Sequence, residues 1–304
     1  MSKDVPEKLQ PYDIHGLDLT YGSGDEEAVA DCPWCGRAGK FSVNINNGMW
    51  RCLVCNEGSN KGKAIQGGNA YIFLRKLWEM SFDATTTKDY KLLADDRRLM
   101  HASSLLEWHL CKSIISDNWL VPGYGADGKL MTLYQYIKGK DGKSVLYPTS
   151  TLGHHIHGRN LYDKKKAVVF LCEGPWDAIA LWETMGCGKE VNGKYSHTGN
   201  REVSLLQDCN VLAVPGCNVF FESWLPLFAG KVVNLMFDND HERTNKKTGA
   251  LIAPGALNGM KTVTRILSEA SEPPESIHYL KWHEQGWDPD LPSGYDVRDF
   301  LTTE

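Results

Sequence analysis

Acidic residues that follow an apolar stretch are the first candidates for chemistry in this chain. Glu173 comes directly after the apolar run 167–172, and Asp177 stands four residues later, where an amphipathic stretch begins. Such a run is typical of a strand buried on both faces of a parallel sheet. We therefore expect Glu173 at the end of a strand and Asp177 in a first helical turn, both facing the crevice where open α/β sheets bind ligands. The alternative is an acidic helix N-terminus that the helix dipole favours.

A second apolar stretch, 231–237, leads into Asp238-Asn239-Asp240. Alternate residues of an extended segment share a face, so both aspartates can point toward one place. Several carboxylates at one sheet edge repel one another strongly unless a cation is present. Carboxylates are also the side chains that Mg²⁺ prefers. The two acidic motifs together predict a Mg²⁺ site suited to phosphoryl transfer.

Two Cys-x-x-Cys pairs predict a structural zinc site. Cys32 and Cys35 form the first pair, Cys52 and Cys55 form the second, and sixteen residues separate the pairs. This spacing is in the range for a four-cysteine zinc ribbon. The segment between the pairs alternates and contains an Asn-Gly turn, as a β-hairpin does. Two copies beside one hairpin argue against the alternative, a redox Cys-x-x-Cys.

The composition is ordinary for a globular protein, and the net charge is not the positive one that would attract nucleic acid to the whole surface. The chain has 304 residues and a net charge of −5, so a nucleic-acid surface must be local. It contains no signal peptide and no long apolar span, so we expect a cytoplasmic protein without a membrane partner. The stretch 56–68 is rich in Gly, Asn and Lys, which predicts a tether.

The order of the acidic motifs resembles the TOPRIM domain of bacterial and phage DNA primases, a domain that topoisomerases and some nucleases share. This resemblance covers about residues 163–301, and the cysteine segment is similar to the N-terminal zinc-binding domain of those primases. The implied fold class is α/β. A zinc ribbon and the start of the tether occupy 1–62, a basic helical and hairpin subdomain occupies 63–162, and a TOPRIM domain with a Rossmann-like parallel sheet occupies 163–304.

The resemblance also implies roles for individual acids. Two Mg²⁺ would be held by Asp238, Asp240 and a further acid, Asp296, from a closing motif at 295–301. Glu173 would act as another ligand or as the base for the attacking hydroxyl, and Asp177 would orient Glu173 or bind metal through water. The family enters a helix directly after the second aspartate of its Asp-x-Asp motif. Here a polar insertion, 241–254, intervenes, either as a flap over the site or as a neutral surface insertion.

Basic and aromatic residues are the candidates for contacts with template and nucleotides. In the ribbon these are Trp34, Trp50 and Arg51, whereas Phe41 is better explained by packing around the metal. A basic cluster also stands before the acidic sheet and comprises Lys138, Lys140, Lys143 and Arg159. The alternatives are packing for the aromatic residues and a solvated surface for the lysines.

The implied function is synthesis of short primers on single-stranded DNA from nucleoside triphosphates, by two-metal nucleotidyl transfer. No helicase P-loop follows, so a replicative helicase would be a separate protein, and a phage-encoded chain would act in the host cytoplasm. Two alternatives stay open. One is a TOPRIM nuclease or recombination mediator, and the other is a template-binding module without catalytic activity.

Overall fold

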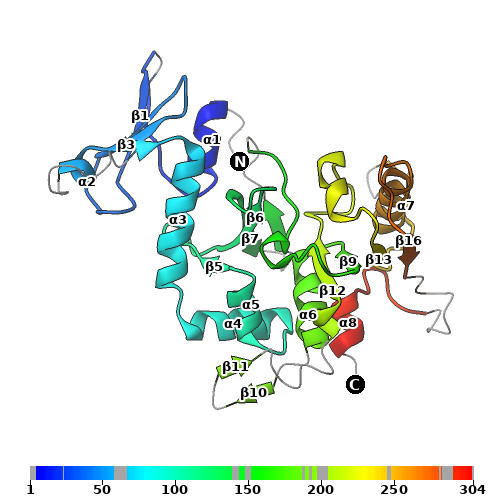
Figure 1. Cartoon of the computed structure of the whole chain (residues 1–304). Coiled ribbons are helices and arrows are strands. Elements are labelled where there is room, and N and C mark those ends of the chain that lie inside the picture. Colours follow the sequence, from blue (N-terminus) through cyan, green and yellow to red (C-terminus); the bar gives the residue numbers. More distant parts are fainter. Residues whose placement is uncertain are drawn as a thin grey trace. The chain divides into compact units, whose positions relative to one another are not determined.

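The computed structural model of the chain describes residues 5–22, 24–57, 67–138, 144–147, 152–186, 189–191, 194–196, 205–244, 248–280, 282 and 290–302. The chain forms two compact units, the first made of residues 1–86 and 109–155, the second of 87–108 and 156–304 (Figure 1). The expected three-part division at residues 62 and 162 stays a prediction.

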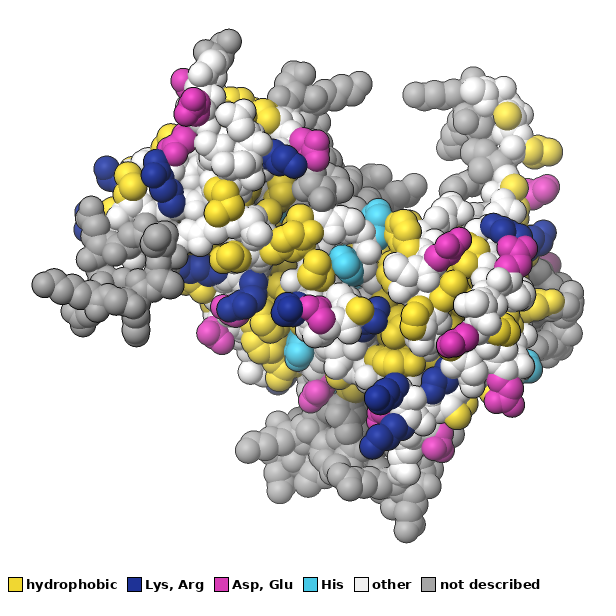
Figure 2. Space-filling model, turned by 45° about the horizontal axis from the view of Figure 1, so that its top comes forward, with side chains coloured by type: hydrophobic (Ala, Val, Ile, Leu, Met, Phe, Trp, Pro, Cys, Tyr) yellow, Lys and Arg dark blue, Asp and Glu magenta, His cyan; other side chains and the backbone are white. Residues whose placement is uncertain are grey.

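On the face shown in Figure 2, Lys and Arg side chains lie among acidic and hydrophobic ones.

The first unit opens with short helices and an antiparallel sheet that carries the cysteines. The helices are η1 (Glu7–Leu9), α1 (Gln10–Asp13) and α2 (Leu53–Glu57). The sheet has the order β1 (Glu27–Ala30), β2 (Phe41–Asn44), β3 (Trp50–Cys52) and β4 (Gly67–Gly68). Strands β2 and β3 are the expected hairpin. The last two residues of the predicted tether instead pair with β3, where a Cβ on Gly67 would lie 2.5 Å from the Trp50 carbonyl oxygen.

A long helix and a second antiparallel sheet complete the first unit. Helix α3 (Ala70–Ala84) begins at Asn69, whose side chain accepts a hydrogen bond from the N–H of Ile72. The sheet has the order β5 (Cys111–Lys112), β6 (Trp119–Tyr124), β7 (Leu130–Lys138) and β8 (Ser144–Tyr147). One buried apolar cluster joins ribbon, helix and second sheet, and its members include Phe41, Trp50, Phe73, Leu77, Leu120 and Leu133. The ribbon therefore shares its core with the rest of the unit.

The second unit is built on a four-stranded parallel sheet of order β12-β9-β13-β16 (Figure 1). Its strands are β9 (Val168–Cys172), β12 (Cys209–Ala213), β13 (Val232–Met236) and β16 (Ser276–Tyr279). The chain leaves β9 toward β12 on one side and then crosses to β13 on the other. Beta-strands 9 and 13 therefore flank the point where the strand order reverses, which is where open α/β sheets bind ligands.

Helices connect the strands of this sheet, and one more follows its last strand. The connecting helices are α6 (Pro175–Gly186), η4 (Leu205–Gln207), η5 (Glu222–Leu227) and α7 (Gly255–Ser268), and α8 (Val297–Thr302) comes after β16. Apolar residues of α7 and η5 pack with β9 and β13 in one core, which contains Val169, Leu171, Val233, Leu235, Val263 and Leu267. The predicted combination of a zinc ribbon with a parallel α/β sheet is thus confirmed.

Shorter elements complete the second unit. These are α4 (Thr87–Arg97), α5 (Ala102–Glu107), η3 (Arg159–Leu161), the pair β10 (Lys189–Val191) and β11 (Lys194–Ser196), and the pair β14 (Arg243–Thr244) and β15 (Leu251–Ile252). Across the part of the chain that the structure describes, no helix has the length and apolar character needed to span a membrane.

Candidate metal and catalytic sites

The four ribbon cysteines come together as the sequence predicts. The sulfur of Cys32 lies 3.8 Å from that of Cys55, the sulfur of Cys35 lies 3.8 Å from that of Cys52, and all four lie within 4.8 Å of one another. Ligand sulfurs about 2.3 Å from a tetrahedral zinc ion are about 3.8 Å apart. The N–H of Cys55 also points to the sulfur of Cys52, at 3.3 Å. These residues fit a structural zinc ion, and within the described residues they are the one group of three or more metal-ligating side chains this close together.

The aromatic residues of the ribbon differ in their surroundings. Phe41 is fully buried and stacks on Trp50 at 5.3 Å between ring centroids, so its predicted packing role is confirmed. Trp50 is 3% exposed, and its indole N–H donates to the Asn69 carbonyl at 3.2 Å. In this arrangement Trp50 presents little surface to a template. Trp34 is half-buried, and the ammonium of Lys76 lies 5.2 Å from its ring centroid.

The basic candidates for template contacts differ in their exposure, and some of them lie outside the described residues. Arg51 is exposed on β3, where its guanidinium lies 2.8 Å from a carboxylate oxygen of Glu27. Arg159 begins η3 and is half-buried. Residues Lys140 and Lys143, and the side chain of Lys138, lie outside the described residues. The roles of these residues in template binding stay predictions.

The two acids at the strand ends lie side by side. Glu173 directly follows β9, and Asp238 comes two positions after the end of the neighbouring strand β13. The N–H of Asp238 donates to Oε2 of Glu173 at 3.3 Å. Asp177 stands in the first turn of α6, which begins at Pro175, and it is 6% exposed. Proline suits this first helical position because its missing N–H would have no partner there. The predicted strand-to-helix placement of the first acidic motif is therefore observed.

Asp240 is held by the helix that follows the insertion. Its Oδ2 accepts a hydrogen bond from the N–H of Ala256 at 3.0 Å, in the first turn of α7. A Cβ on Gly255 would lie 3.2 Å from the same oxygen, so the small residue allows this close approach. The pair β14–β15 lies within the insertion 241–254, and the chain then returns to the acid. The helix expected directly after the Asp-x-Asp motif therefore begins later in the sequence, but its first turn lies beside Asp240.

Asn239, between the two aspartates, fastens the C-terminal segment to the sheet. Its N–H donates to the Tyr295 carbonyl at 2.8 Å, and its side-chain amide donates to the carbonyls of Leu291 and Pro292 at 3.3 Å. Asn239 continues the buried face of β13, so the aspartates on either side of it fall on the opposite face. This attachment positions Asp296 near the other acids.

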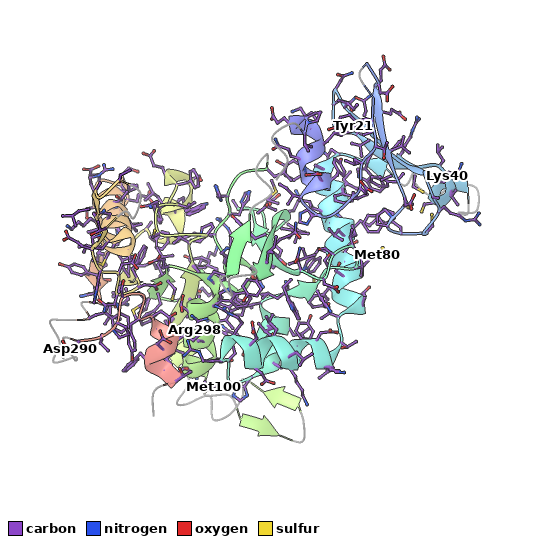
Figure 3. The ribbon with its side chains drawn as sticks, turned by 180° about the vertical axis from the view of Figure 1, so that it is seen from behind. Tyr21, Lys40, Met80, Met100, Asp290 and Arg298 are labelled. Carbon is purple, nitrogen blue, oxygen red and sulfur yellow. The ribbon has the colours of Figure 1, made fainter. Side chains whose placement is uncertain are left out.

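Asp296 caps the last helix and meets a buried arginine. Its Oδ1 accepts from the N–H of Asp299 at 2.7 Å, and Asp299 accepts from the N–H of Asp296 at 3.3 Å, a reciprocal cap of α8. Nη2 of Arg298 lies 2.5 Å from Oδ2 of Asp296, and Nε lies 3.9 Å from Oδ1 of Asp177. Arg298 is labelled in Figure 3, on the helix that packs beside α6. The sequence analysis missed Arg298; its place inside the closing acidic motif was the available clue.

Burial and mutual repulsion shape the ionisation of this cluster. Burial, with the charges of Asp177, Glu173, Asp296 and Asp240, raises the pKa of Asp238 to about 10. Burial is also the main reason that the pKa of Glu173 rises to about 7. The pKa of Asp177 rises to about 7 through burial and the charge of Asp296, opposed by Arg298.

One carboxylate oxygen decides whether a cation fits here. Oδ1 of Asp238 is buried and, within the residues that the structure describes, has no hydrogen-bond partner. A buried ionised oxygen without a partner is costly, and a bound cation would remove that cost. The acids Glu173, Asp238 and Asp240 therefore fit a divalent cation by their chemistry.

A cavity of about 590 Å³ opens beside Asp238 and Asp240. Its other walls are mainly apolar and include Phe237, Met260, Leu280 and Trp282. Cavities of this size accommodate small organic molecules.

Solved structures similar to this chain include three from bacteria and a phage. The Aquifex aeolicus primase (zinc-binding and RNA polymerase domains) is 14% identical, with 99% of this chain and 82% of that chain covered and a TM-score of 0.43. The primase fragment of the bacteriophage T7 primase-helicase protein is 13% identical, with 92% of this chain and 93% of that chain covered and a TM-score of 0.39. A DNA primase domain from Pseudomonas aeruginosa is 14% identical, with 76% of this chain and 74% of that chain covered and a TM-score of 0.46.

All three are DNA primases. This is the family that the sequence motifs resemble. No family model matches the sequence, and no curated protein matches it.

Proposed function

We propose that this chain is a DNA primase that makes short primers on single-stranded DNA by metal-dependent nucleotidyl transfer. The observation that carries the proposal is a buried oxygen of Asp238 that has no hydrogen-bond partner among the described residues. It lies among further carboxylates at the edge of a parallel sheet where such sheets bind ligands. A four-cysteine ribbon in the same chain supports a role on a nucleic-acid template.

The acids divide the chemical work as follows. Asp238 and Asp240 would hold Mg²⁺, which when bound would neutralise charge that develops on the triphosphate. Glu173 would be a further ligand or, where it does not bind the ion, a proton acceptor, since burial raises its pKa to about 7. It is therefore the candidate base for the primer 3′-hydroxyl, which attacks the α-phosphate of the next nucleotide as pyrophosphate leaves.

The candidate contacts for substrate and for template lie in different parts of the chain. The cavity beside Asp238 and Asp240 has the size and apolar lining to receive part of a nucleoside triphosphate. Exposed Arg51 and half-buried Trp34 are the ribbon groups available to a single-stranded template, with Arg159 and the lysines at 138, 140 and 143 as further phosphate contacts. A separate replicative helicase would deliver that template, in the cytoplasm of a bacterial host.

The test combines synthesis and cleavage in one design. The zinc-loaded protein is incubated with Mg²⁺, labelled nucleoside triphosphates and a pool of single-stranded DNA, and the products are sized. We expect short, template-dependent oligonucleotides that disappear in the Asp238→Asn variant. A parallel reaction with end-labelled DNA and no nucleotides detects nuclease activity.

Two results would overturn the proposal. Mg²⁺-dependent cleavage of the labelled DNA without synthesis would identify a nuclease. Template binding without synthesis or cleavage, at every template and nucleotide mixture tried, would identify a non-catalytic module.

A further inference from the structure

Arg298 divides the acidic crevice into two halves of different charge. Its guanidinium contacts Asp296 at 2.5 Å and Asp177 at 3.9 Å, and the three side chains are 11%, 8% and 9% exposed in that order. An arginine does not lose its proton in a protein, so this half keeps a fixed positive charge. Arg97, whose guanidinium lies 4.8 Å from the Trp176 ring centroid, adds a second favourable charge for Asp177.

In the other half, no lysine or arginine of the described residues forms an ion pair with the acids, although Lys261 and Arg265 line the cavity beside them. Glu173 accepts from the N–H of Asp238, and Asp240 accepts from the N–H of Ala256, so these carboxylates have main-chain donors. Among the ion pairs of the described residues, none involves Glu173, Asp238 or Asp240. Within the described residues, Oδ1 of Asp238 and Oδ1 of Asp177 are both buried without a hydrogen-bond donor, so the two halves differ in the arginine charge beside them and not in hydrogen bonding.

We infer that Arg298 is a built-in cation for one half of the crevice, so that the chain binds one divalent cation in the other half. An ion placed on Asp177 or Asp296 would lie beside the guanidinium and be repelled by it. Arg298 is thus a positioning residue that replaces the second metal ion expected from the sequence. The catalytic meaning of the bound ion rests on the proposed function, but the number of bound ions does not.

The experiment counts ions directly. Mn²⁺ is titrated into the zinc-loaded full chain, and free Mn²⁺ is followed by electron paramagnetic resonance. We expect about one Mn²⁺ per chain, since the unpaired half holds one set of oxygen ligands. Asp238→Asn should abolish this binding. Asp296→Asn should keep the count and lower the affinity by less than about tenfold, because Asp296 acts on Asp238 only through its charge. Asparagine should preserve the cap of α8, so the variant stays folded.

Removing Arg298 should create a second cation site at Asp177 and Asp296. Arg298→Gln should raise the count to about two Mn²⁺ per chain, as the freed carboxylates then need a new cation. Arg298→Lys, which keeps a charge, should stay at the wild-type count. The matched control is Arg75→Gln, since Arg75 is an exposed member of an ion pair with Glu79 on α3.

Three outcomes would overturn the inference: two Mn²⁺ on the wild-type chain, a large loss of affinity in Asp296→Asn, or an unchanged count in folded Arg298→Gln. If Arg298→Gln fails to fold, the Asp296→Asn titration decides the question. The primer assay is independent of these counts. A chain that binds one Mn²⁺ in this pattern but makes no primers would contradict the proposed function and leave the role of Arg298 standing.

Discussion

The N–H of Asp238 donates a hydrogen bond to Oε2 of Glu173 at 3.3 Å, and this bond ties the end of β13 to the end of β9. The two carboxyl groups are held close together in a buried crevice as a result. Both have pKa values raised by burial, that of Glu173 to about 7 and that of Asp238 to about 10. The folded chain therefore retains protons that the unfolded chain releases.

The first prediction concerns pH. Above about pH 4.5 the unfolded chain loses the proton of Glu173, whereas the folded chain keeps it until about pH 7. The unfolded state then binds fewer protons, so the stability of the Mg²⁺-free protein should fall as pH rises through this window. Melting temperatures measured without Mg²⁺ from about pH 5 to pH 8 should decline, and added Mg²⁺ should reduce the decline. A melting temperature that rises with pH over this range would contradict the assignment.

The second prediction separates a metal ligand from a structural aspartate. Asp238→Asn should leave the Mg²⁺-free melting temperature unchanged or raise it, because folding no longer has to keep this buried carboxyl protonated. Primer synthesis should fall by roughly 10²- to 10³-fold, the usual effect of losing one charge-stabilising group at a transition state. The stabilisation by Mg²⁺ should also disappear. A variant that melts early yet still makes primers would show that Asp238 is structural.

The parts of this site that depend only on residues close together in the chain could be predicted from the sequence. An apolar strand followed by Glu173, and another followed by Asp238, can be recognised because strand burial and the carboxyl edge are local properties of the pattern. Arg298 could not be paired with Asp177 in advance, since 121 positions separate them and Asn239 brings the C-terminal segment back to the sheet. The common core of ribbon and second sheet depends likewise on distant contacts, such as those that put Phe41 and Leu133 in one cluster.

The third prediction follows from that common core. Elemental analysis should find about one zinc per chain. Removing zinc by chelation should loosen α3 and the ribbon together, because Phe73 and Leu77 pack in the same cluster as Phe41 and Trp50. Hydrogen exchange should then show lost protection in both segments, while the parallel sheet of the second unit stays protected. Loss confined to residues 27–57 would indicate an independently folded ribbon.

The fourth prediction uses two adjacent ribbon residues. Trp50→Ala should destabilise the protein by roughly 3–5 kcal/mol, as expected for a large buried side chain. Arg51→Ala should cost at most about 1 kcal/mol, since it removes an exposed ion pair. The arginine variant should instead weaken single-strand binding and flatten its dependence on salt. An unchanged salt slope for Arg51→Ala would assign this residue to the solvated surface.

The fifth prediction tests the contact between α7 and the loop after β12. A Cβ on Gly259 would lie 2.1 Å from the Cys217 carbonyl oxygen, whereas a Cβ on Gly216 would meet nothing within 4 Å. Gly259→Ala should therefore cost about 1–3 kcal/mol of unfolding free energy, and Gly216→Ala should stay within about 0.5 kcal/mol of the wild type. Chemical denaturation of both variants measures the difference. Equal stability would mean that the helix shifts freely.

The main-chain hydrogen bonds to Glu173 and Asp240 have a thermodynamic consequence for cation binding. Each of these two carboxylates is already oriented by a peptide N–H, from Asp238 and Ala256 respectively. Their rotational freedom is lost when the chain folds and not when an ion arrives. Cation binding should therefore carry little conformational entropy cost, and selectivity among ions should follow from size, because the oxygens cannot easily spread to suit a larger ion.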